Sequence, residues 1–191
     1  MADYSGGGGS GTGVGALLYD FTISGADATA IDTFVDNGGG GVGAALSSSY
    51  KRMSVSLYSR TDEATAQSGI SVTANNDATG LYDIGRILNV NGTQTLTSLV
   101  SQSAWLLITA GTSDAAGVFG VWDIEIPNYT TTNAKQASAV LGLADSTIGQ
   151  VQSGTYALNY RGALGLTRLA VTPTTGGRKL KVGTRLTIYG F

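Results

Sequence analysis

The feature that most constrains the fold is a two-residue alternation of apolar and polar side chains, which recurs in short stretches along most of the chain. The last stretch, residues 178–191, shows it clearly. Its core-facing set is predicted to be Val182, Thr184, Leu186 and Ile188. A period of two places alternate side chains on opposite faces of a β-strand. The chain ends on an apolar and aromatic tip, which we expect to be packed because mobile tails are usually polar.

Similar stretches, separated by turn residues, predict further strands. They cover residues 17–24, 29–35, 50–59, 69–73, 81–90, 104–110, 118–126, 135–143, 152–163 and 166–172. Residues 96–99 form a short apolar piece of uncertain type. Residues 135–143 contain helix-favouring alanines, but we assign them as a strand because of their neighbours. Asn91-Gly92 is the strongest hairpin signal in the chain.

This pattern predicts an all-β fold. Short strands at intervals of about 10–20 residues, with no long helical pattern, are typical of an antiparallel sandwich or a barrel. We predict a single antiparallel β-sandwich domain, jelly-roll-like, over residues 16–191. Charged residues make up only 13% of the chain, against a usual value of about 25%. Such a composition, with 29 glycines, fits tight turns better than a helical enzyme.

Residues 1–15 form a Gly/Ser-rich N-terminal arm (MADYSGGGGSGTGVG). This composition cannot bury enough apolar surface to fold alone. The ordinary interpretation is a flexible leader. If the arm is ordered, we expect a partner surface or a neighbouring copy to hold it, and Tyr4 is a candidate partner contact within it.

The residue inventory excludes several kinds of chemistry. The chain has no cysteine, so disulfides, thiolate metal sites and a cysteine nucleophile are excluded. It has no histidine, the commonest general base and metal ligand. We expect no catalytic residues, no cofactor and no metal. No basic stripe with interleaved aromatics predicts nucleic-acid binding, and no apolar run approaches the ~20 residues of a membrane span.

Charge is distributed unevenly. Residues 1–95 hold nine acidic and four basic side chains, and residues 96–191 hold four acidic and seven basic. This asymmetry is either ordinary surface solubility or charge complementarity between copies. The densest basic cluster is Arg178, Lys179 and Lys181, with Arg185 nearby. These four are candidate contacts with an acidic partner, and the alternative for the cluster is a solvated turn.

Three groups of residues have a functional and a structural interpretation. Asp123 and Glu125 share one strand face, as a glycosidase pair could, but a solvated or salt-bridged pair with Arg185 or Arg168 is the expected alternative. A turn rich in side-chain oxygens could bind Ca²⁺, but it lacks the order of a dedicated loop and fits an ordinary turn; its residues are Asn75, Asn76, Asp77 and Asp83. Trp105 and Trp122 could stack on a sugar, although large aromatics in apolar strands are more often core.

Three groups of segments together resemble small virion proteins and fibre-tip domains of tailed phages. They are residues 53–60 (MSVSLYSR) with 72–77 (VTANND) and Tyr82; residues 122–129 (WDIEIPNY) with Lys135; and residues 166–171 (LTRLAV) with 183–190 (GTRLTIYG). The spacing and the closing LTIYGF are the specific parts. The resemblance covers about residues 50–191, and the arm lies outside it.

The resemblance implies a β-sandwich subunit of a phage capsid or tail, commonly a homotrimer, located in the virion and assembled in the host cytoplasm. It carries over no catalytic residue. The expected function is capsid decoration, with the chain binding itself and the major capsid protein or another virion protein.

Two other functions remain open at this stage. A tail-fibre tip or receptor-binding knob would recognise a bacterial surface glycan through exposed Tyr58, Tyr129 and Trp105 and the Gly-rich loops. A depolymerase or glycosidase would depend on Asp123 and Glu125.

Overall fold

The computed structural model describes residues 15–34, 45–115, 117–145 and 150–191. These residues form strands and loops and contain no helix. The strands are β1 (Ala16–Thr22), β2 (Ile31–Asp32), β3 (Arg52–Ser59), β4 (Gln67–Ala74), β5 (Tyr82–Val90), β6 (Thr93–Gln102), β7 (Trp105–Ala110), β8 (Gly120–Pro127), β9 (Lys135–Asp145), β10 (Gln150–Tyr160), β11 (Leu169–Pro173) and β12 (Arg185–Gly190).

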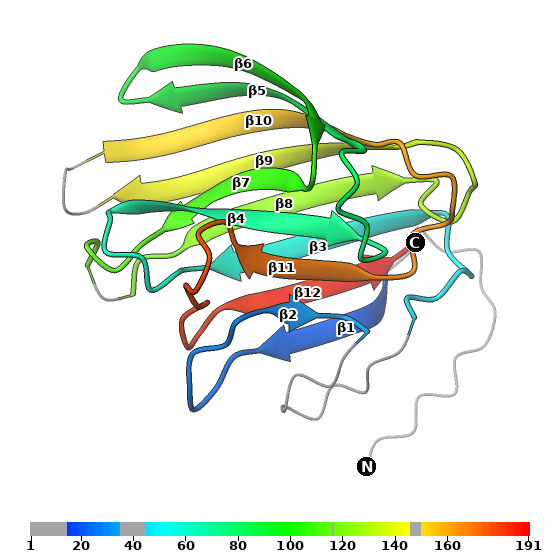
Figure 1. The fold of residues 1–191 in the computed structure, drawn as a ribbon, viewed down its shortest axis with the longest axis horizontal. Coiled ribbons are helices and arrows are strands. Elements are labelled where there is room, and N and C mark those ends of the chain that lie inside the picture. The colour runs from blue at the N-terminus through cyan, green and yellow to red at the C-terminus, as the bar shows by residue number, and fades with distance from the viewer. Residues whose placement is uncertain (1–14, 35–44, 116, 146–149) are drawn as a thin grey trace.

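The strands form two sheets that pack face to face (Figure 1). The larger has eight strands in the order β1-β12-β3-β8-β9-β10-β5-β6, and the smaller has four in the order β2-β11-β4-β7. All pairs of named strands are antiparallel. The predicted all-β antiparallel sandwich is therefore confirmed. The jelly-roll topology stays a prediction.

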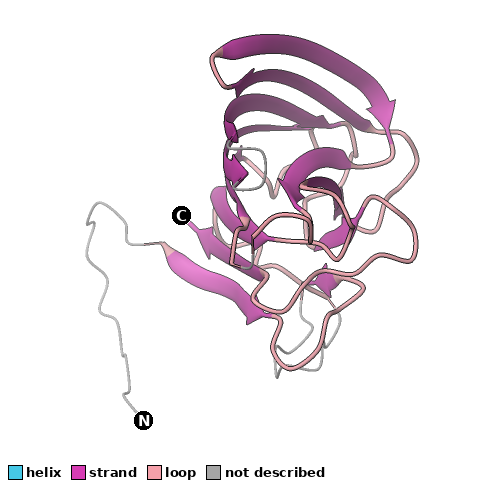
Figure 2. Cartoon of the chain, turned by 90° about the vertical axis from the view of Figure 1, so that its left-hand side faces the viewer, coloured by secondary structure: helices cyan, strands magenta, loops and turns pink. Residues whose placement is uncertain are grey.

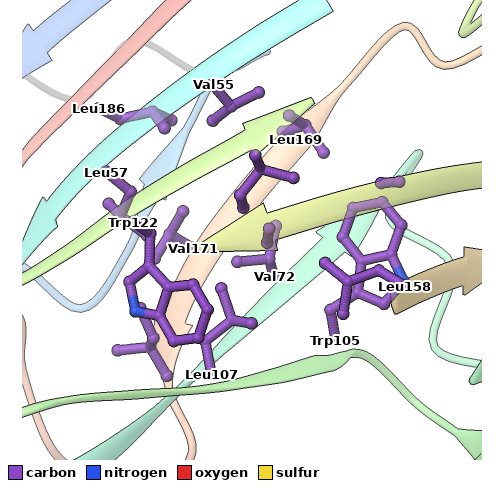
Figure 3. Packing of buried hydrophobic residues seen from close by; sticks show 14 of the residues in the cluster. Val55, Leu57, Val72, Trp105, Leu107, Trp122, Leu158, Leu169, Val171 and Leu186 are labelled. Carbon is purple, nitrogen blue, oxygen red and sulfur yellow. The ribbon is translucent and has the colours of Figure 1, made fainter. Parts of the chain in front are cut away.

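The alternation seen in the sequence decides which side chains are buried. In β3 and β8, every second residue is buried between the sheets and the residues between them are more exposed. The buried side chains of the two sheets interlock around Trp105 and Trp122, both fully buried (Figure 3). Each indole N–H finds a backbone acceptor, Asn159 O at 3.0 Å for Trp105 and Ile108 O at 2.7 Å for Trp122. Both tryptophans are thus core residues, as the structural interpretation predicted.

The predicted hairpin joins β5 to β6. Asn91 and Gly92 both have positive φ, 49° and 84°, as a type I′ turn requires. β6 pairs with β5 along its length, with one irregularity opposite Asp83. The four-stranded sheet leaves this hairpin largely uncovered, and the hairpin curves away at one end of the larger sheet (Figures 1 and 2).

Several predicted boundaries were wrong. Residues 96–99, to which no type was assigned, belong to the ten-residue strand β6, which follows the hairpin turn and is rich in strand-favouring threonines. The expected strand at residues 29–35 is reduced to β2, and Val35 lies outside the described residues. The closing strand begins at Arg185, because residues 181–183 form a turn in which Gly183 has φ 93°. Residues 135–143 are strand, as predicted.

Candidate interaction surface

The largest surface feature of the described chain is the face of the eight-stranded sheet that points away from the smaller sheet. We call it the outer face. Its composition follows from the strand register, because residues paired across neighbouring strands lie on the same face. One cross-strand row contains Thr187, Ser56, Asp123, Val140, Thr155, Ile87 and Leu96. The next contains Tyr189, Ser54, Glu125, Ser138, Ala157, Gly85 and Ser98.

One half of the outer face, on β9, β10, β5 and β6, is aliphatic and nearly uncharged. Large apolar side chains stand exposed there: Ile87 (47%), Leu96 (80%), Val100 (65%), Val140 (55%) and Val151 (67%). Ile87 and Leu96 pair directly and Val140 shares their cross-strand row, whereas Val100 and Val151 stand four residues farther along their strands. Single exposed apolar residues are ordinary, but several on one sheet face suit a binding surface. This half of the sheet is therefore suited to contact with another macromolecule.

The other half, on β1, β12, β3 and β8, carries charges that are mostly paired. Arg185 donates two hydrogen bonds to Asp20, at 2.8 and 2.7 Å. The bond from Arg185 is the largest influence on the pKa of Asp20 and holds it below its usual value. Asp123 accepts a hydrogen bond from Ser56 at 2.6 Å. Little net charge is left on this half to repel a partner.

A groove of about 550 Å³ crosses the outer face over β9, β10, β5 and β6. Small residues from the four strands form its floor: Ser138, Ala157, Gly85 and Ser98. These four small residues lie in register across the four strands, so no large side chain fills this part of the row. The groove is thus shallow and continuous, and an extended ligand could lie in it.

One rim of the groove is polar. Asn159 donates to Asp83 at 3.0 Å, and Asp83 also accepts the backbone N–H of Ser101 at 3.0 Å. The bond from Ser101, then that from Asn159, keeps the pKa of Asp83 below its usual value. Asn159 Oδ1 is buried and accepts no hydrogen bond. The rim therefore presents to the groove the ionised carboxylate of Asp83, which also lies 3.3 Å from Arg161.

The basic candidates do not form one surface. Lys181 is bound to Asp27, with Nζ 2.7 Å from the carboxylate. Arg185 is committed to Asp20 on the outer face. Arg178 and Lys179 lie exposed in the loop before β12, and within the described ranges no ion pair uses either side chain. Of the four basic candidates, Arg178 and Lys179 are therefore the two that stay available to an acidic partner.

Tyr4 lies outside the described residues, as does most of the arm. The described chain starts at Gly15, where an added Cβ would lie 2.5 Å from the ring of Phe191. The backbone of Phe191 is bonded to Lys51 and Arg52, so the end of the chain is held against the sheet, while Tyr189 and Phe191 stay 39% and 37% exposed. Gly15, the last residue of the arm, therefore lies beside the C-terminus.

Three aromatic residues were expected to be exposed in a glycan-binding knob, and two of these assignments were wrong. Trp105 and Tyr129 are fully buried, because both point into the core. Tyr58 is 41% exposed and stacks on Phe119, with ring centroids 4.4 Å apart. Of these three aromatics, Tyr58 alone could present its ring to a ligand.

The carboxylate pair also has different partners from those expected. Glu125 lies 3.7 Å from Arg52, and Asp123 bonds Ser56. Arg168 pairs with Asp32 in the smaller sheet, and Arg185 with Asp20, because each base lies nearer to another acid. Asp123 and Glu125 are thus members of a polar surface network.

The Asn/Asp-rich turn after β4 has the structure of a turn. Asn75 and Asn76 have positive φ, and Asn75 Oδ1 accepts the backbone N–H of Thr167 at 2.9 Å. Asp77 accepts from Thr79. In the described ranges, no three His, Cys, Asp or Glu side chains lie close enough together to hold a metal ion.

The outer-face groove and the free edge of β6 were not identified from the sequence. The groove depends on small residues from four strands lying in one row, which no local pattern reveals. The strand β6 did have a signal, since Asn91-Gly92 followed by alternating threonines predicts a hairpin arm.

Comparisons with known proteins identify no relative. No protein-family description, no curated protein and no solved structure matches the chain. The described part of the chain has no helix of the length and apolarity needed to cross a membrane.

Proposed function

We propose that this chain is a structural subunit of a tailed-phage virion, a decoration protein that attaches to the capsid and to its own copies without catalysis. The observation that carries the proposal is the outer face: a broad, mostly charge-paired sheet surface with exposed aliphatic side chains and nothing covering it among the described residues. The resemblance in the strand motifs supplies the context.

The size of the outer face suits such a role. Eight strands about 4.8 Å apart, each with about seven residues rising about 3.3 Å, make a face of roughly 900 Å². A stable protein interface buries about 800 Å² on each partner. One such face can therefore provide a complete contact with a shell protein.

The mechanism would be burial of apolar area by a preformed surface. The outer face lies on a hydrogen-bonded sheet with a core behind it, so little conformational entropy is lost when it docks. The arm would add affinity by ordering against the shell, and free Arg178 and Lys179 would steer attachment to acidic patches. The homotrimer implied by the resemblance remains part of the proposal.

One specific observation favours a second function. The groove, with its amide and carboxylate rim and exposed Tyr58 farther along the same face, has the polar and aromatic groups that bind sugars. In that case the chain would be a tail-fibre tip or receptor-binding knob for a bacterial surface glycan.

The test is a phage from which the gene has been deleted. A decoration protein predicts particles with unoccupied sites on the head and faster loss of infectivity on heating or dilution of salt. Heads that are unchanged, with adsorption to host cells lost, would replace decoration by the receptor-binding function. Particles unchanged in both respects would refute both.

A further inference from the structure

The edge strand β6 lacks most of the features that normally protect a free strand, and its one bulge lies near its end, at Ser101. Proteins protect exposed edges with charges, proline, bulges or short strands, since unpaired N–H and C=O groups invite pairing with another chain. β6 ends the eight-stranded sheet and runs for ten residues, TQTLTSLVSQ. It has no charged residue and no proline, and its alternating threonines favour strand structure.

The other described sheet edges are protected. β1 carries Asp20, which is ion-paired to Arg185. β2 is two residues long and carries Asp32, which is bound to Arg168. β7 has its side chains buried or half-buried. Of the four edges in the described sheets, β6 alone is long, uncharged and exposed on both faces.

Two large apolar side chains on β6 have a partner on one side only. Leu96 is 80% exposed and lies opposite Ile87 of β5. Val100 is 65% exposed. Both point to the outer face, because Leu96, Ser98 and Val100 alternate with inward residues. Each therefore has an empty position on its free side where a neighbouring strand would supply a cross-strand partner.

We propose that β6 pairs antiparallel with β6 of a second copy of this chain, about a twofold axis at Ser98. In this register Ser98 faces its own counterpart, and Leu96 of each copy faces Val100 of the other. Thr97 then faces Leu99 on the inner side. The two sheets become one continuous sheet of sixteen strands, twice the eight of one copy.

The second copy fits this edge better than an arbitrary strand. Leu96 and Val100 lie two residues on either side of Ser98, so a single twofold register covers both side chains in both copies. An isologous contact of this kind closes on itself and produces a discrete pair of chains, not a fibre. Ser101 has φ 55° at an irregularity in the strand, and this bulge limits how far pairing extends.

This inference rests on the self-association that is part of the proposed function, and it names the surface responsible. A twofold contact through β6 leaves the remainder of the outer face free for the capsid. It is also compatible with a trimer, since twofold contacts can link one trimer to the next.

The test uses the absence of cysteine from the chain. In the variant Ser98→Cys, each copy of the dimer carries one thiol, and the two thiols face each other across the twofold axis. The Cα–Cα distance of such a cross-strand pair lies within the range of a disulfide. Mild oxidation of the purified protein should give a covalent dimer, separated on a non-reducing gel. The control is Ser153→Cys, exposed on the same face but on β10, inside the sheet. Ser98→Cys should crosslink at least roughly tenfold faster than Ser153→Cys, because thiols held opposite each other have a high effective concentration.

A second pair of variants tests the contact without oxidation. Leu96→Lys places a charge on the edge and should raise the dimer dissociation constant by roughly a hundredfold, through lost apolar burial and repulsion. Val140 is also exposed on the outer face, but it lies on the interior strand β9. The control Val140→Lys should therefore leave the dimer dissociation constant unchanged. Analytical ultracentrifugation over a range of protein concentrations measures both.

The outcomes separate this inference from the proposed function. Equal crosslinking of the two cysteine variants, or a wild-type protein that stays monomeric, overturns β6 pairing. A stable oligomer unaffected by Leu96→Lys overturns it too, but leaves self-association intact. Specific crosslinking at Ser98 in a protein absent from phage particles would support the β6 contact and refute the virion role.

Discussion

The buried hydroxyl of Tyr82 gives a sharp test of how the two sheets are joined. Tyr82 is fully buried at the start of β5, and its ring stacks on Tyr160 with centroids 4.9 Å apart. The hydroxyl accepts the backbone N–H of Ala74 at 2.7 Å and lies 2.8 Å from the carbonyl oxygen of Asp77. It therefore links the larger sheet to the last residue of β4 in the smaller one.

The substitution Tyr82→Phe keeps the ring and removes this link. Ala74 is fully buried, so its N–H loses its acceptor with no water to replace it. A buried donor left without a partner costs about 1–3 kcal/mol. For a domain of this size, 2 kcal/mol corresponds to a fall in Tm of roughly 4–8 °C.

Urea unfolding followed by tryptophan fluorescence measures the effect directly, because both indoles are in the core. Tyr58→Phe is the matched control: its ring is 41% exposed, and the variant should unfold within about 0.5 kcal/mol of wild type. If Tyr82→Phe were as stable as Tyr58→Phe, the hydroxyl could not be the buried link between the sheets.

Three further predictions concern stability. The hydrogen bond from Ser101 lowers the pKa of Asp83. Its carboxylate therefore stabilises the fold fully above about pH 4, and this contribution is lost as the pH falls further. In acid titrations, Asp83→Asn should lose less stability than the wild type. Lys135 is 1% exposed, no ion pair among the described residues includes it, and burial lowers its pKa. At pH 7, Lys135→Met should unfold at the same urea concentration as the wild type or a higher one, because the substitution removes the cost of a buried charge. Gly111→Ala should lower the stability measured by thermal unfolding by about 1–3 kcal/mol, because the added Cβ would lie 2.1 Å from a backbone oxygen. Gly85→Ala is the control: its added Cβ would lie 3.9 Å from the nearest atom, so its stability should not fall.

The fold class could be predicted because it depends on local alternation. Apolar residues in β3, β8 and β12 are spaced by two, and this spacing alone sets which side of each strand is buried. Turn residues such as Asn91-Gly92 mark the strand ends. The register between strands distant in sequence, such as β3 with β12, has no local signal, so the eight-and-four division of strands could not be predicted.

The interaction surface was less predictable for the same reason. Arg185 and Lys181 were candidate contacts with an acidic partner, but each is paired with an acid more than 150 residues earlier in the chain. Trp105 could be assigned to the core from its apolar neighbours, but Tyr129, which lies in a polar segment, could not. The groove and the β6 edge arise only when strands from different parts of the chain are placed side by side.

Electron microscopy of phage particles labelled with an antibody against this chain tests the central claim most directly. A decoration protein predicts label in a regular array over the head. Label confined to the tail tip would contradict decoration and establish a receptor-binding position. Purified particles without label would refute a virion role altogether.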